Sequence, residues 1–164
     1  MWTPQTVFVC ALMLLGRSEQ SFPTVQFIEK APAPVSPSAE AYVLTDENRV
    51  VLITSSWAFR VARAAQDRCG RVQALQQIAG VLAHEEWHVR HGLDEEGAYD
   101  AQLTALTSVG ADPVLFNSVM RAKLRTVNES KRQARTSVMA RGTAPDVVSH
   151  SGAAASLDGR RGSP

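Results

Sequence analysis

The pattern of apolar and polar positions begins with a run of nine apolar residues, Val7 to Leu15. The run is too short for a membrane span, which needs about 20 residues. It fits the apolar stretch of a signal peptide, although the basic residues and the cleavage site typical of one are missing. Residues 1–20 are therefore expected to form either a possible signal peptide or a hydrophobic arm, and export stays an open question.

A proline-rich stretch comes next, because residues 29–40 read EKAPAPVSPSAE. Proline, serine and alanine in this mixture favour an extended chain, so residues 21–40 are assigned to a linker. Beyond it, the apolar residues 41–44, the turn-forming residues 45–48 and the β-branched residues 49–54 predict a β-hairpin. The second strand of that hairpin offers an edge to which an extended peptide could pair.

Helical periodicity dominates the rest of the chain. Apolar residues at helical spacing predict helices over about 57–68 and 72–91, then from about 95 to 109 and from 113 onward. Capping residues support these limits: Gly92 ends one helix, Asp94 begins the next, and the pair Asp112-Pro113 begins the last. The predicted fold class is α+β and mostly helical, with one small domain over 41–139 and a disordered tail over 140–164.

Composition narrows the possible functions. The 164 residues suit one domain, and a net charge of +1 provides no basic field for nucleic acid or anionic lipid. Two cysteines are too few for a disulfide framework, and Cys69 is expected to be an ordinary thiol. Histidine is the unevenly distributed residue: of four in the chain, three lie within eight residues, at His84, His88 and His91.

Two of these histidines belong to an H-E-x-x-H motif, formed by His84, Glu85 and His88. Residues four apart on a helix lie about 6 Å apart along its axis and on the same face, so both imidazoles can reach one ion. Glu85 follows the first histidine, where its carboxylate can accept a proton from a metal-bound water. The motif therefore predicts a site for one zinc ion.

Catalytic zinc normally takes a third protein ligand. The candidates are Glu95, Asp94 and Glu96, which follow the turn at Gly92. Glu95 is preferred, because the carboxylate of an N-cap Asp94 already accepts backbone N–H groups. One straight helix cannot wrap His84 and His91 around a single tetrahedral ion, so His91 is expected at the rim of the site or in solvent.

At these residues the sequence resembles the zincin metallopeptidases of the gluzincin type, and in particular their short, single-lobe bacterial members. The segment Asp94 to Gln102 is similar to the D-E-x-x-A-Y-x-x-Q segment of those proteins. The resemblance implies that His84, His88 and Glu95 hold zinc and that Glu85 is the base. The spacing to the third ligand is shorter than in larger gluzincins. A metzincin pattern fits less well, because His91 replaces its glycine.

Other residues of the segment have open roles. Tyr99 could orient Glu95, donate to an oxyanion, or simply pack half-buried. Asp100 and Gln102 could be hydrogen-bond partners of the histidines, although a solvated position is the better interpretation for Asp100.

The expected function is hydrolysis of peptide bonds by a metal-activated water, with a peptide or protein as substrate, no nucleic acid and no integral membrane span. The alternatives are a non-catalytic zinc-binding or interaction module that uses the same ligands, and a helical protein whose histidines hold no metal. The sequence names no substrate.

Overall fold

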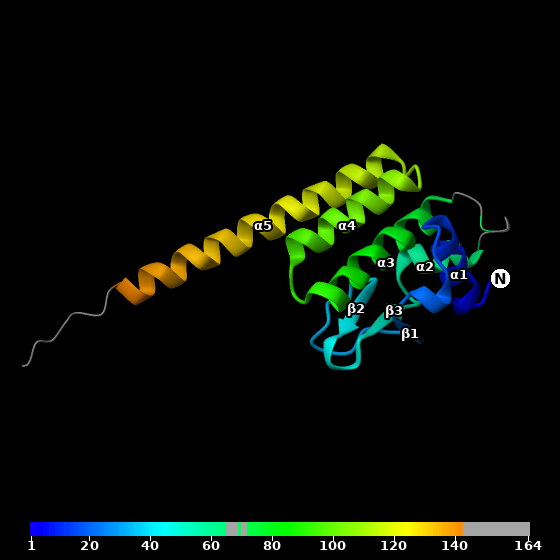
Figure 1. Cartoon of the computed structure of the whole chain (residues 1–164), viewed down its shortest axis with the longest axis horizontal. Coiled ribbons are helices and arrows are strands. Elements are labelled where there is room, and N and C mark those ends of the chain that lie inside the picture. Colours follow the sequence, from blue (N-terminus) through cyan, green and yellow to red (C-terminus); the bar gives the residue numbers. More distant parts are fainter. Residues whose placement is uncertain (65–68, 70–71, 143–164) are drawn as a thin grey trace, which may run out of the picture.

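The computed structural model describes residues 1–64, 69 and 72–142, with side chains as far as residue 133. Helices predominate in the described residues, and a small mixed sheet accompanies them, so the predicted α+β, mostly helical class is confirmed (Figure 1). The elements in chain order are α1 (Pro4–Leu14), β1 (Thr24–Ile28), β2 (Ala41–Leu44), β3 (Arg49–Ile53), α2 (Trp57–Ala64), α3 (Gln73–His91), α4 (Glu95–Ser108) and α5 (Pro113–Gly142).

The sheet has the strand order β1-β3-β2. β2 and β3 form the predicted antiparallel hairpin, and Asn48 ends its turn in the left-handed conformation that asparagine tolerates. The prediction of an open edge on the second strand is wrong, because β3 is central and pairs with β1 on its other side in parallel register. β1 lies inside the expected linker, and its alternating sequence TVQFI is the signal that reveals it.

The N-terminal helix α1 is part of the main core rather than a loose arm. Val7, Phe8 and Leu12 are buried against α2, α3 and the sheet, so the folded body begins well before residue 41. Cys10 forms a disulfide with Cys69 across a sequence separation of 59 residues. The expectation of an ordinary thiol at Cys69 is therefore wrong, because the docking of α1 brings the two cysteines together.

Helix α3 is the central element, in contact with α1, α2, α4 and the sheet (Figure 1). Its limits agree with the predicted helix over 72–91, and it ends at Gly92, whose positive φ of 75° favours glycine. Asp94 then begins α4, where its side chain accepts a hydrogen bond from the backbone N–H of Gly97. This short turn folds α4 back along α3.

Glycines allow α3 and α4 to approach closely. A Cβ at Gly80 would lie 2.9 Å from the Leu106 side chain, and a Cβ at Gly97 would lie 2.6 Å from the Trp87 ring. No larger residue fits at Gly97 without moving that ring. The beginning of α4 is consequently held against the last turns of α3, which carry the H-E-x-x-H motif.

Helix α5 begins at Pro113 with a bond from the backbone N–H of Val114 to Asp112, as the capping residues predict. Its first turns pack on α4 through a small apolar cluster, and its later part extends beyond the rest of the body (Figure 1). The expected disordered tail begins too early, because residues 140–142 continue α5, and the rest of it, from 143 onward, lies outside the described residues. Among the described helices, none has the length and apolar character needed to cross a membrane.

Candidate metal centre

The two histidines of the motif meet on one face of α3. The Nε2 atoms of His84 and His88 are 3.1 Å apart, and the rings meet edge to face. The Nδ1 atom of His88 lies 2.8 Å from the carbonyl oxygen of Gly92, to which it can donate its proton. That bond favours the tautomer in which the Nε2 lone pair is free for a metal. The turn at the end of α3 thus orients a predicted ligand.

Glu95, in the first turn of α4, completes the group. Its carboxylate oxygens lie 3.7 Å from His84 Nε2 and 3.5 Å from His88 Nε2. The three possible ligand atoms all lie within 4.8 Å of one another. The structure therefore brings together the three residues that the sequence analysis preferred as zinc ligands.

These separations fit one small cation. Ligand atoms about 2.0–2.2 Å from a tetrahedral zinc ion stand about 3.3 Å from one another, close to the observed 3.1 to 3.7 Å. Two imidazoles and one carboxylate are also a donor set of catalytic zinc sites. Zinc binding by this group remains a prediction.

The pKa of His84 is lowered to about 4, mainly by burial and then by the neighbouring His88, while Gln102 acts in the opposite direction. His84 is therefore neutral near pH 7, as a metal ligand must be. Its Nδ1 atom is buried and has no hydrogen-bond partner of ordinary geometry among the described residues. The buried side chain of Gln102 is the polar group beside His84. This position is compatible with its predicted role as a hydrogen-bond partner of a histidine.

Glu85 is buried beside the ligand group, with only 8% of its surface exposed. Burial and, second, the charge of Glu95 raise the pKa of Glu85 to about 8. A buried carboxyl group whose pKa lies near neutrality is suited to accept and return a proton. Its position agrees with that of the predicted base.

His84 and Glu85 open onto a cleft of about 830 Å³ between the sheet side of α3 and the helices α4 and α5. Tyr99 lines this cleft and packs edge to face on His84, with ring centroids 4.9 Å apart. The packing role predicted for Tyr99 is thus observed, and a role for its hydroxyl group remains a prediction.

Three cleft residues with charged or amide side chains were not among the predicted site residues: Glu40, Gln77 and Arg125. Gln77 donates a 2.7 Å hydrogen bond to Glu40, and burial raises the pKa of that carboxyl group. No local pattern marks these residues, because they come from the segment before β2, from α3 and from α5. Only the packing of those elements brings them to one cleft.

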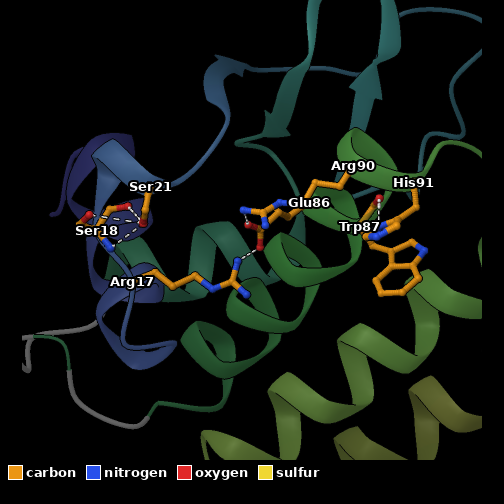
Figure 2. Close-up of polar contacts among 7 residues, drawn as sticks. All are labelled: Arg17, Ser18, Ser21, Glu86, Trp87, Arg90 and His91. Atoms are coloured by element: carbon orange, nitrogen blue, oxygen red, sulfur yellow. Dashed lines mark hydrogen bonds and ion pairs between the residues drawn. The ribbon is translucent and has the colours of Figure 1, made fainter.

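The remaining candidates lie outside the ligand group. Asp94 is occupied as the cap of α4, and Glu96 is exposed in the same turn. His91 stacks on Trp87 with ring centroids 3.9 Å apart, on the exposed side of α3 (Figure 2). Asp100 forms a 2.5 Å ion pair with Lys123 of α5 and does not contact the histidines. The position of Asp100 agrees with the interpretation of a solvated residue.

Comparisons with known proteins add no family: no protein-family model matches the chain, and no match was found among curated proteins or solved structures.

Proposed function

We propose that this protein is a zinc-dependent metallopeptidase of the zincin-like type, with Glu85 as the general base. The observation that carries the proposal is the group formed by His84, His88 and Glu95, with buried Glu85 beside it at the wall of a cleft. A metal-ligand group, an acid–base residue and a concave substrate site in one place are the parts that this reaction needs.

Each residue has a defined task in this proposal. His84 and His88 from α3 and Glu95 from α4 hold the ion, and the bond from His88 to the Gly92 carbonyl fixes one imidazole. Bound zinc lowers the pKa of a coordinated water and polarises a carbonyl group. Glu85 accepts the proton of the attacking water and returns it to the leaving amine.

The cleft gives a peptide a place to lie. Residues 37–41, which lead into β2, form part of its wall. β2 is an edge strand, and in the described residues only its β3 side is paired. An extended peptide could therefore add to that free edge by main-chain hydrogen bonds, which suits a substrate recognised by its backbone.

The substitution Glu85→Gln tests the proposal. It removes the base but keeps the shape, so we expect the variant to bind one zinc ion and to lose roughly 10²- to 10⁴-fold in the hydrolysis rate. The assay measures cleavage of a mixture of fluorogenic peptides by zinc-loaded protein. The matched control is Glu129→Gln, an exposed glutamate on α5, which should retain full activity.

The outcomes separate the competing functions. Unchanged hydrolysis in the Glu85→Gln variant would remove Glu85 from the mechanism. Stoichiometric zinc without any hydrolysis by the native protein would favour the non-catalytic zinc-binding module.

A further inference from the structure

A second cavity lies behind α3, on the side away from the candidate metal centre. Its volume is about 510 Å³, within the range of small-molecule sites. It is lined by the chain that follows α1 and by residues of α3 and α4, and its lining includes Arg17, Glu86 and Arg90. The small side chains of Ala83, Ala101 and Ala105 also line it and leave its interior open.

Two arginines in this cavity share one carboxylate. Glu86, whose side chain is only 5% exposed, forms ion pairs with Arg17 and with Arg90, the latter at 2.5 Å. Figure 2 shows the two guanidinium groups on either side of the carboxylate. A turn closed by bonds between Ser18 and Ser21 follows directly after Arg17 and holds the chain at that point.

Two positive charges against one negative charge leave an excess of one positive charge. Asp100, the other acidic side chain lining the cavity in the described part of the chain, is paired with Lys123 and does not offset it. Burial, and second the charge of Arg90, lower the pKa of Arg17. The two arginines therefore repel each other in a partly desolvated place, and an additional anion would relieve this repulsion.

Both arginines have donors left for such an anion. A guanidinium group carries five N–H donors, and each arginine contacts Glu86 through one terminal nitrogen. The side chain of Arg17 is 39% exposed and that of Arg90 is 58% exposed, so a ligand can reach them from solvent. Paired N–H groups of this kind match the oxygens of a carboxylate or a phosphate.

We infer that this cavity is a binding site for a small oxyanion, a carboxylate or a phosphate, held between Arg17 and Arg90. The inference does not depend on the proposed peptidase activity. On a helix with about 100° per residue, Glu86 and Arg90 point away from the face that carries His84 and His88. The oxyanion site and the metal centre therefore occupy opposite sides of α3.

Isothermal titration calorimetry of the full chain tests this inference, with inorganic phosphate and succinate as probes. We expect one saturable site for at least one of the two anions, and the preferred anion identifies the ligand class. Arg90→Gln should weaken binding at least about tenfold, because a charge-assisted hydrogen bond is lost. The control Arg60→Gln, on the exposed surface of α2, should leave it unchanged.

Two further variants keep the test decisive. Arg17→Lys keeps the positive charge beside Glu86 but loses the planar set of N–H donors of the guanidinium group, so it should also weaken anion binding. This variant provides the test if Arg90→Gln folds poorly. His84→Ala should bind the anion normally, which excludes phosphate bound at the metal centre. Absence of saturable binding of both anions up to about 10 mM, or equal affinity in the native protein and in folded Arg90→Gln, would overturn the inference.

Discussion

Adjacent residues of α3, Glu85 and Glu86, are both buried glutamates, yet their surroundings differ completely. Glu86 pairs with Arg17 and Arg90, whereas Glu85 forms no ion pair with a cation among the described residues and faces the charge of Glu95. The pKa of Glu85 is raised to about 8 as a result. Glu86 is compensated by two arginines, whereas the surroundings of Glu85 favour its neutral, protonated form near pH 7.

The contrast suggests different roles for two neighbouring residues of α3: a structural role for Glu86 and a chemical role for Glu85. Burial of an uncompensated carboxylate lowers stability, so a fold keeps one mainly where it serves a function. A paired carboxylate instead ties its own helix to the chain after α1. Under the proposed function, the side of α3 with Glu85 serves catalysis, whereas the side with Glu86 attaches the N-terminal segment and carries the proposed anion site.

The largest expected effect concerns that attachment. Reduction of the Cys10–Cys69 disulfide should lower the free energy of unfolding by about 4 kcal/mol, because the bond closes a loop of 59 residues. Denaturant unfolding with and without reductant measures the loss. The zinc content of the reduced protein should be unchanged after the reductant is removed. Equal stability of both forms would contradict the tethering role of α1.

The second prediction compares the two glutamates directly. Glu86→Gln should lower the free energy of unfolding by about 2–3 kcal/mol, somewhat less than for a fully buried pair, because the arginines retain contact with solvent. Glu85→Gln should leave stability unchanged or raise it, since an uncharged amide of the same shape avoids the cost of protonating the buried carboxyl group on folding. Denaturant unfolding of both variants provides the measurement. If both variants lost the same stability, the distinction between the two sides of α3 would fail.

A smaller effect is expected at the contact between α3 and α4. Gly97→Ala should cost about 1–2 kcal/mol and weaken zinc binding, because the new Cβ meets the capping carboxylate of Asp94 and the rigid Trp87 ring, and so disturbs the first turn of α4, which carries Glu95. Gly80→Ala is the matched control. There the Cβ meets the buried Leu106 side chain and, at 3.3 Å, Gln102, and the gain in helix propensity of about 1 kcal/mol offsets part of the cost of these contacts. Retained zinc affinity in Gly97→Ala would show that the glycine does not position Glu95.

Local patterns predicted much of the fold. The hairpin, the limits of α3 and the beginnings of α4 and α5 follow from periodicity and capping residues such as Gly92 and Asp94. These signals act within a few residues, so they are readable without tertiary structure. The grouping of His84, His88 and Glu95 was expected because a short turn between two helices brings their facing turns together.

The rest depends on contacts between distant segments. The parallel pairing of β1 with β3, the disulfide from Cys10 to Cys69 and the pairing of Arg17 with Glu86 all require that the N-terminal segment dock on the body. Composition favoured a linker there, and only the packed core shows that the segment belongs to it. The positive charge that Arg17 places beside Glu86 could not be predicted from the sequence for the same reason.

The central claim is that one side of α3, together with Glu95, holds a metal ion, and the zinc content of the purified protein tests it most directly. After loading with zinc and removal of the excess, elemental analysis should find one zinc per chain in the native protein and in His91→Ala. His84→Ala should lose more than about 100-fold in zinc affinity. The loss should be this large because the variant removes a ligand, whereas removal of a residue that only hydrogen-bonds to a ligand costs about 10- to 100-fold. Absence of stoichiometric zinc in the native protein, or its full retention in His84→Ala, would contradict the account.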